Sequence, residues 1–386
     1  LPDSQHLVIP PEHPSIIKMV GESDIVQNAA CKEGLGIPKR CKRSSFEITS
    51  WYNIEEARIS EALDLKKRTT DRSMQAAYCI GEHLQLNGCY EMTGRMFPHP
   101  KNQQATFLIS NYSATENALD TYVCKSLDEL KIFQPKKWSV DSIQEKIDDL
   151  YEDLENNVTY IYKRRDLHLM VDLAYHSPLW LEVNGKLEKG WAEVLIVGDT
   201  GVGKSWVSGN LMRHYALGEL VECKNATAAG LLGGQESFNK RWFITWGKIP
   251  SNDRGLVLLE ELKGMPANVF ARLTETRSSG VAQITGIAKG DQRTPARTRI
   301  IANSNPRSDR NISDYNYGVD CLVELIGSRE DLRRFDAAII VERNEVPEIE
   351  FTRVRTPTLH TYTQGLCREL VLWSWTRDKA VFEDEA

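Results

Sequence analysis

The sequence lacks long apolar runs. Runs such as residues 256–259 fall far short of the roughly 20 apolar residues that a membrane-spanning helix needs. The sequence also lacks a charged start followed by an apolar segment, which is the pattern of a secretory signal. These absences predict a cytoplasmic protein with no membrane partner.

Paired cysteines are absent as well. The eight cysteines are scattered and no two have CxxC spacing, which is typical of free thiols in a reducing compartment. Two groups combine residue types that zinc favours, namely Cys31 with Cys41, and Cys79 with His83, Cys89 and His99. Their spacings match no compact zinc knuckle, so zinc is the less favoured interpretation.

There is no excess of positive charge. The chain has 48 lysines and arginines against 54 aspartates and glutamates, a net charge of −6. Binding of nucleic acid would therefore require local basic surfaces rather than a global attraction. With 386 residues, of which 41% are hydrophobic and 26% charged, we expect a globular protein of two or three domains.

Residues 1–130 are predicted to form a β-rich N-terminal domain. Alternating apolar and polar residues at 45–52 and 89–96, and an apolar run at 105–109, predict short strands separated by glycine and proline. Such a series favours a small β-barrel or sandwich.

Residues 131–189 are predicted to form a helical linker. Ile143, Ile147, Leu150 and Leu154 recur at helical spacing, with acidic residues between them.

Residues 190–350 alternate between predicted strands and helices. Strands at 193–197, 255–259 and 299–302 are separated by a helix after Lys204 and another around 266–274. This alternation predicts an α/β fold with a parallel sheet and helices on both faces. Phosphates bind at the carboxyl ends of the strands in such a sheet.

The apolar run at 194–197 leads directly into a phosphate-binding P-loop. All its defined positions are filled, by Gly198, Asp199, Thr200, Gly201, Val202, Gly203, Lys204 and Ser205. The glycines let backbone N–H groups turn around a polyphosphate, and the following helix adds the positive end of its dipole. Lys204 is expected to reach the β- and γ-phosphates, and Ser205 to supply a hydroxyl to Mg²⁺.

The strand at 256–259 ends in Glu260 and Glu261, which together have the form of a Walker B element. Glu260 is predicted to hold Mg²⁺ through water, and Glu261 to orient and deprotonate the attacking water. The first of these positions is usually Asp, so Glu260 is a departure from the pattern.

Two more positions extend the predicted site. Asn303 and Asn305 follow another core strand, and an amide at its tip could hold the attacking water against the γ-phosphate. Arg333 and Arg334 precede the apolar run at 337–341. An arginine there could enter the site of a neighbouring subunit, although a surface charge explains these residues equally well.

These elements, in this order, resemble the AAA+ ATPase module of the minichromosome maintenance (MCM) helicases. The resemblance covers roughly residues 190–350 and continues weakly to 386. It rests on segments 225–231, 255–265, 296–297, 305–306 and 334–336. It favours Asn305 over Asn303 as the sensor amide and Arg334 as an arginine finger. The chain departs from the family at Thr200 and Gly203, where Pro and Ala are common.

The resemblance implies a ring, usually a hexamer, that binds ATP between subunits and DNA in a central channel. It implies two hairpins directed into that channel, at about 232–249 and 281–298. In the second, Lys289, Arg293 and Arg297 are the DNA-binding candidates. It also implies an oligonucleotide-binding (OB) fold in the N-terminal domain and the start of a helical lid at 351–386.

The leading interpretation is an ATP-dependent DNA helicase or translocase that acts as a homo-oligomeric ring. One alternative is an AAA+ remodelling ATPase similar to the MoxR and McrB families, which carry similar hairpins. Another is an ATP-gated DNA clamp with little hydrolysis. Two features suggest it: Glu260 in place of the usual Asp, and the lack in residues 1–386 of the family's sensor 2 arginine, a lid residue of the nucleotide site.

Overall fold

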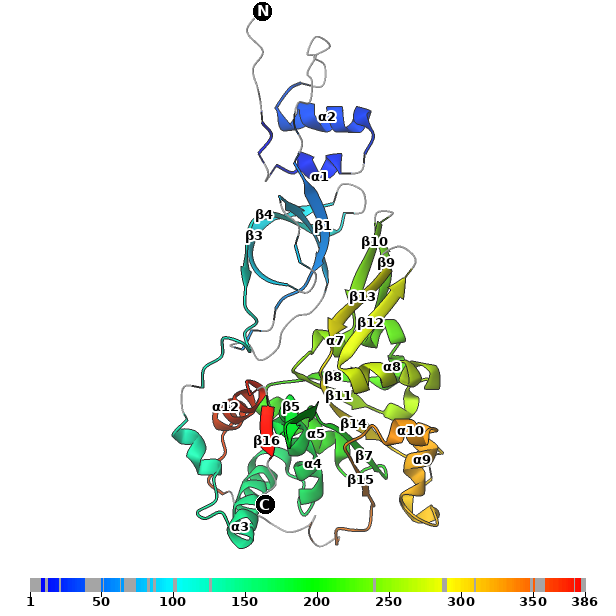
Figure 1. Ribbon diagram of the computed structural model, residues 1–386. Helices are drawn as coiled ribbons and strands as arrows, with labels where there is room; N and C mark the ends of the chain where they lie inside the picture. Colours follow the sequence, from blue (N-terminus) through cyan, green and yellow to red (C-terminus); the bar gives the residue numbers. More distant parts are fainter. Residues whose placement is uncertain are drawn as a thin grey trace, which may run out of the picture. The chain divides into compact units, whose positions relative to one another are not determined.

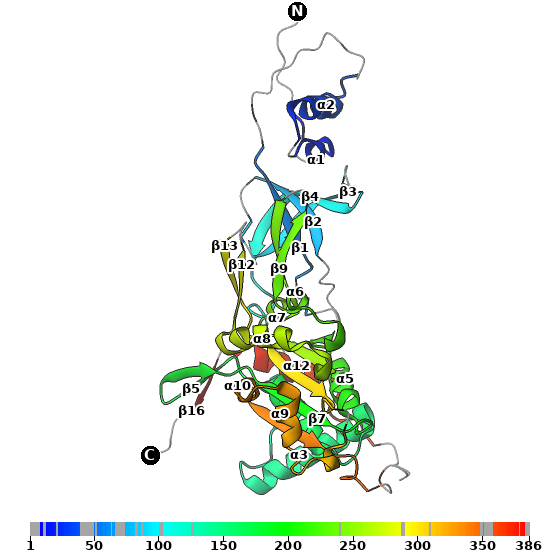
Figure 2. The same cartoon turned by 90° about the vertical axis from the view of Figure 1, so that its right-hand side faces the viewer.

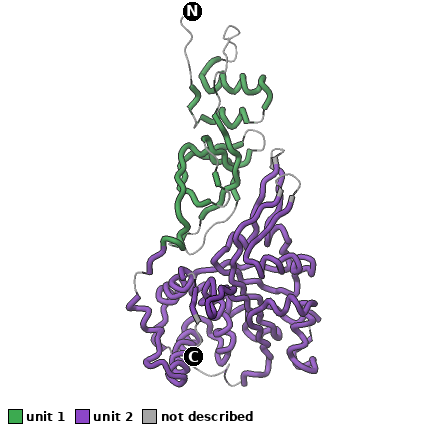
Figure 3. The backbone as a smooth tube through the Cα atoms, in the orientation of Figure 1, with its two compact units in different colours: residues 1–121 green, residues 122–386 purple. Residues whose placement is uncertain are grey.

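The computed structural model describes residues 8–10, 13–20, 22–38, 50, 52–62, 64–65, 74–81, 84–85, 88–99, 103–124, 127–238, 241–286, 290–308, 310–347, 350, 358–377 and 379–382. The chain divides into two compact units, residues 1–121 and 122–386 (Figure 3).

The first unit is built around a four-stranded sheet with the strand order β1-β2-β4-β3. The pairs β1–β2 and β3–β4 are antiparallel, whereas β2 and β4 are parallel. A bulge in β3 falls at Gly94, where a Cβ atom would overlap the main-chain oxygen of Leu108. The elements are α1 (Ser15–Met19), α2 (Asp24–Gly34), β1 (Ile54–Ile59), β2 (Gln75–Ile80), β3 (Cys89–Pro98) and β4 (Ala105–Thr115).

This sheet only partly matches the predicted N-terminal domain. The predicted strands at 89–96 and 105–109 correspond to β3 and β4, whereas most of the predicted strand at 45–52 lies outside the described residues. An OB-fold is a five-stranded barrel. The described part of this unit has four paired strands, so the OB-fold is not confirmed.

The second unit contains a five-stranded parallel sheet (Figure 1). Its order is β15-β7-β14-β11-β8, and every neighbouring pair is parallel. The strands are β7 (Glu193–Gly198), β8 (Glu219–Glu222), β11 (Leu256–Glu260), β14 (Arg299–Ser304) and β15 (Ala337–Val341). The first of them in the chain, β7, lies between β14 and β15. The strand order therefore reverses beside β7, which leaves a crevice at its carboxyl end.

Helices cover both faces of this sheet, as predicted. On one face α4 contacts β7, β14 and β15, and α5 and α12 pack against α4. On the other face, α8 and α9 contribute to a core shared with β7, β11 and β14. The helices are α3 (Val140–Leu154), α4 (Arg165–His176), α5 (Lys204–Tyr215), α6 (Ala228–Leu231), α7 (Lys248–Ser251), α8 (Ala267–Ser279), α9 (Asp320–Ile326), α10 (Arg329–Leu332) and α12 (Gln364–Trp375), with short turns η1 (Glu129–Phe133), η2 (Glu155–Thr159), η3 (Cys223–Asn225), η4 (Leu262–Gly264) and η5 (Ile312–Asp314).

The helices predicted as a linker belong to this second unit. Helix α4 is amphipathic, and it buries Leu167, Val171 and Ala174. Because these side chains lie against the sheet and its neighbouring helix, residues 165–176 are part of the α/β body rather than a separate linker.

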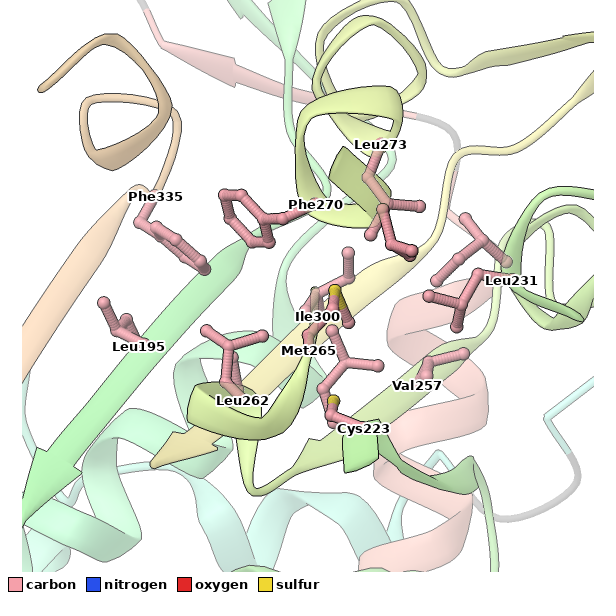
Figure 4. Packing of buried hydrophobic residues seen from close by; sticks show 14 of the residues in the cluster. Leu195, Cys223, Leu231, Val257, Leu262, Met265, Phe270, Leu273, Ile300 and Phe335 are labelled. Carbon is pink, nitrogen blue, oxygen red and sulfur yellow. The ribbon is translucent and has the colours of Figure 1, made fainter. Parts of the chain in front are cut away.

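Apolar side chains make up most of the core between the sheet and α8, where Arg277 of α8 is also buried. Leu195 of β7 and Ile300 of β14 pack with Phe270 and Leu273 of α8 (Figure 4). Leu195 and Val197 alternate with residues that face the opposite side of the sheet, and β7, β11 and β14 are buried along their whole length. Their nearly continuous apolar sequences follow from this burial on both faces.

Two antiparallel hairpins extend from the α/β body, at the positions that the family resemblance implies. The first pairs β9 (Gly233–Phe238) with β10 (Arg241–Trp246), and the second pairs β12 (Val281–Gly286) with β13 (Gly290–Pro295). They lie side by side, with β9 in contact with β12 (Figures 1 and 2). A separate three-stranded sheet joins β16 (Lys379–Phe382), β5 (Trp180–Val183) and β6 (Lys186–Lys189).

No helix within the described ranges combines the length and apolar character needed to cross a membrane.

Candidate nucleotide site

The P-loop connects β7 to α5 at the carboxyl edge of the parallel sheet. Gly201 and Gly203 have φ angles of 85° and 92°, which residues with a Cβ rarely adopt. A Cβ at Gly198 would overlap the main-chain oxygen of Val341 on β15. The loop therefore needs glycine both for its own turn and for its close approach to the neighbouring strand.

Asp199 anchors this loop rather than contributing an exposed charge. Its buried carboxylate accepts hydrogen bonds from the backbone N–H groups of Ile312 (2.8 Å) and Arg343 (2.9 Å), and its own N–H donates to the Val341 oxygen. The P-loop is thus tied to η5 and to the end of β15. Thr200, at the tip, is exposed and interacts with Asn305.

Lys204 begins α5 and is only 7% exposed. Its ammonium donates to the main-chain oxygens of Gly198 (2.8 Å) and Asp199 (2.7 Å), and to Oδ1 of Asn305 (2.9 Å). Burial lowers its pKa to about 8, against the partial opposition of the Asp199 and Glu260 charges. The structure thus brings two candidate site residues, Lys204 and Asn305, into direct contact.

Ser205 and Glu260 also meet at this edge. The Ser205 hydroxyl donates to Glu260 Oε2 (2.6 Å), and the Asn303 amide donates to Glu260 Oε1 (2.8 Å) and to Ser208 Oγ (2.6 Å). Burial raises the pKa of Glu260, and the hydrogen bonds from Ser205 and Asn303 oppose that shift. The family resemblance favours Asn305 over Asn303, but Asn303 is the residue that contacts the first Walker B acid directly.

The residues at this point fit a magnesium ion. Mg²⁺ takes one or two protein oxygens and keeps several waters, so Ser205 Oγ and Glu260 could hold it. Asn303 Oδ1 is buried and, among the described residues, lacks a hydrogen-bond partner, which leaves one more oxygen acceptor beside Glu260. Among all the residues that the structure describes, no group of three or more His, Cys, Asp or Glu side chains could hold a metal ion.

Glu261 stands just beyond β11 in the left-handed conformation, with φ of 54°. This backbone separates it from the buried Glu260, and its carboxylate pairs with the Lys224 ammonium at 2.5 Å. The carboxylate raises the pKa of Lys224. Sequence reasoning missed Lys224. Lys224 lies near Glu261 because β8 pairs with β11, which sets Glu222 beside Glu260. This pairing cannot be predicted without the order of the strands in the sheet.

Arg334 lies at the opposite edge of the sheet from the P-loop. It precedes β15, whose first residue Ala337 pairs with Val194 near the start of β7, whereas the P-loop follows the end of β7. Its Nε atom is buried and makes no hydrogen bond to any described residue. Arg334 therefore does not complete the site of its own subunit.

The three DNA-binding candidates have different environments. Lys289 lies outside the described residues. Arg293 is exposed on β13, opposite Gln283 of β12. The guanidinium of Arg297 forms a two-point pair with the Asp253 carboxylate, with distances of 3.1 and 2.7 Å. Its charge is thus already neutralised at the hairpin base, which argues against the predicted DNA contact for Arg297.

The described zinc candidates of the first unit lie on different elements. Cys79 is buried in β2 and Cys89 begins β3, while His99 contacts the Tyr78 hydroxyl and Cys31 of α2 lies beside Met19. Cys41 and His83 lie outside the described residues.

Together the parallel sheet, the P-loop and the two acids at the end of β11 define a P-loop α/β nucleotide-binding protein. Residues 140–350, more than half of the chain, match the family model of the MCM P-loop domain. The chain therefore belongs to the MCM family, as a divergent member. This membership indicates an AAA+ ATPase or helicase type of function. The match begins within α3, inside the segment predicted to be a linker.

A curated relative is an uncharacterized MCM-type protein of Methanocaldococcus jannaschii. It is 25% identical over 153 residues, which make up 39% of this chain and 20% of the relative. The match thus spans about a fifth of that protein.

Proposed function

We propose that this chain is an ATP-dependent DNA helicase or translocase that acts as a homo-oligomeric ring and hydrolyses ATP between subunits. The observation that carries the proposal is the separation of two sets of residues. Lys204, Glu261 and Asn305 lie at the carboxyl edge of the sheet, while Arg334 lies at the amino edge. Arg334 is therefore too far from the P-loop of its own subunit, and in this proposal it acts at the site of a second copy.

The chemistry follows from the residues at each edge. On binding, the triphosphate replaces the oxygens that Lys204 contacts in the free protein. Asn305 already touches Lys204, so its amide lies beside the position of the γ-phosphate, where it can orient the attacking water. Glu261 accepts the proton of that water, and Arg334 of the adjacent subunit stabilises the charge on the transferred phosphoryl group. Mg²⁺, when bound, supplies further charge neutralisation at Ser205 and Glu260.

The two hairpins supply the DNA contact in this proposal. They project from the α/β body, and Arg293 of the second hairpin is exposed. Contacts from such a side chain to phosphates are independent of base sequence, as translocation requires. Lys289 in the same hairpin is a second candidate.

The variant Glu261→Gln tests the hydrolytic site. It removes the proton acceptor but keeps the size of the side chain, so ATP should still bind while turnover falls by about 10²-fold or more. Nucleotide binding by fluorescence and phosphate release in the same preparation measure the two effects. Turnover at the wild-type rate would remove Glu261 from the role of base.

The remodelling ATPase is the second candidate, because Thr200 and Gly203 make the P-loop closer to a general P-loop than to the usual MCM sequence. Strand displacement on forked DNA separates the two. The helicase proposal predicts unwinding that requires ATP and fails with Glu261→Gln. ATP turnover that DNA does not stimulate, without unwinding, would favour the remodeller.

A further inference from the structure

Helix α8 joins the two edges of the sheet. It follows the Walker B strand by way of η4, and its first residue, Ala267, is close in sequence to Glu261. Past the middle of the helix, Thr274 Oγ1 donates to the carboxylate of Asp331 at 2.6 Å. The main-chain oxygen of Asp331 in turn accepts a hydrogen bond from the N–H of Arg334. One helix thus packs with the η4 segment that follows Glu261, through Leu262 and Met265, and is hydrogen-bonded to the segment before Arg334.

Arg277 makes the second connection between α8 and the Arg334 segment. It is 4% exposed, and its Nε donates to the carboxylate of Glu193 on β7. Its guanidinium carbon lies 4.2 Å from the ring centroid of Phe335 and 5.2 Å from that of Phe270. The two rings are nearly parallel, with an angle of 21° and centroids 6.4 Å apart (Figure 4).

A purely structural ion pair explains Arg277 poorly. Glu193 already has a cationic partner, because Lys189 Nζ lies 2.8 Å from its other carboxylate oxygen. The Nη1 and Nη2 atoms of Arg277 are buried and have no hydrogen-bond partner among the described residues. A buried cation with unused donors is costly compared with an apolar side chain of the same volume. The distinctive contribution of the guanidinium is its flat face against Phe335, the residue next to Arg334.

We propose that Arg277 is a positioning residue for the nucleotide site of the neighbouring subunit. By its contact with Phe335, Arg277 holds the Arg334 side chain in place. The inference rests on the proposed interfacial site. The inference also connects two nucleotide sites, because α8 links Glu261 of the subunit's own site to Arg334, which completes the neighbour's site. A shift of α8 caused by one bound nucleotide would therefore move the arginine at the neighbouring nucleotide.

The variant Arg277→Met replaces the guanidinium with an apolar side chain of similar length and leaves Glu193 paired with Lys189. ATP turnover of the assembled protein should fall about tenfold or more, because a small displacement of a catalytic group is enough for such a loss. Nucleotide affinity of the subunit's own P-loop should stay within about twofold, since no P-loop contact changes. Arg272→Met, an exposed arginine on the same helix, is the matched control.

Subunit mixing separates positioning from damage to the subunit's own site. A Lys204→Ala subunit cannot use its own P-loop but carries an intact Arg334, so mixing it with Arg277→Met should restore turnover. The Arg334→Ala and Lys204→Ala mixture is the positive reference. A mixture of Glu261→Gln and Lys204→Ala, whose defects are both on the P-loop side, should stay inactive.

The outcomes are distinct. If the reference mixture recovers turnover and the Arg277→Met mixture does not, the positioning role is overturned while the interfacial site stands. If the reference mixture itself fails, the proposed function fails first. Arg277→Lys keeps the charge but not the flat face, so full turnover of that variant would also overturn the role. Should Arg277→Met fail to fold, Phe335→Leu removes the same contact from the other side and must behave identically in the mixtures.

Discussion

Lys204 is almost completely buried in the free protein, and no carboxylate of a described residue forms an ion pair with its ammonium. Its three hydrogen bonds go to two main-chain oxygens and one amide oxygen. These neutral acceptors leave the cost of burying the charge largely uncompensated, and the pKa of Lys204 is lowered to about 8. A bound triphosphate supplies the missing negative charge and favours the protonated form.

ATP affinity should therefore depend on pH above about 8. Below this value Lys204 is already protonated in the free protein, and above it binding must take up a proton. The dissociation constant should rise with pH and approach about a tenfold increase per pH unit while the complex stays protonated. Fluorescence titrations with a labelled nucleotide from about pH 7 to 9.5 measure this slope.

Lys204→Met is the control for this dependence. Its binding should be weaker but nearly flat with pH across the same interval. A wild-type profile as flat as that of the variant would show that Lys204 does not titrate in this range.

At the scale of elements, the P-loop is held in place by the end of β15 and by η5 through Asp199. A single buried carboxylate accepts both hydrogen bonds, and its donors Ile312 and Arg343 lie 113 and 144 residues away in sequence. The loop is therefore shaped before nucleotide binds, which reduces the conformational entropy that binding must overcome.

Asp199→Ala should lower the free energy of unfolding by about 2 kcal/mol, since the buried N–H of Ile312 loses its acceptor. Nucleotide affinity should fall as well, because the loop loses its anchor. Chemical denaturation measures the first effect and nucleotide titration the second. The control is Glu145→Ala, an exposed acidic residue on α3. Equal stability of both variants would contradict the anchoring role.

The elements that could be predicted from sequence are those with a local signal. The P-loop, the Walker B strand and the parallel sheet each have a compact pattern, and all three are present. The roles of Asp199, Arg277 and Arg297 could not be predicted, because their partners Ile312, Glu193 and Asp253 are distant in sequence. In the first unit, the parallel pairing of β2 with β4 has no short-range signature.

At the scale of the whole molecule, a net charge of −6 gives DNA no general attraction to this chain. DNA binding must then depend on a few basic side chains on the projecting hairpins. In a ring, each such side chain is present once in every subunit. The salt dependence of binding counts these contacts, since it reports the counterions that phosphates release.

Arg293→Ala should weaken DNA binding and reduce its salt dependence. The slope of log affinity against log salt should decrease by about 0.7 to 0.9 for every Arg293 that contacts a phosphate in the ring. Fluorescence anisotropy with labelled DNA at several salt concentrations gives the slope. Arg272→Ala, an exposed arginine outside the hairpins, should leave it unchanged. Equal slopes for Arg293→Ala and the wild type would place the DNA contact elsewhere.

In the proposed ring, each nucleotide site is completed by two subunits. ATP turnover in a mixture of Lys204→Ala and Arg334→Ala subunits tests this arrangement. Each variant alone should be inactive, whereas the mixture should regain turnover, because some interfaces join an intact P-loop to an intact arginine. Full activity of Arg334→Ala alone, or a mixture as inactive as its components, would contradict the interfacial site.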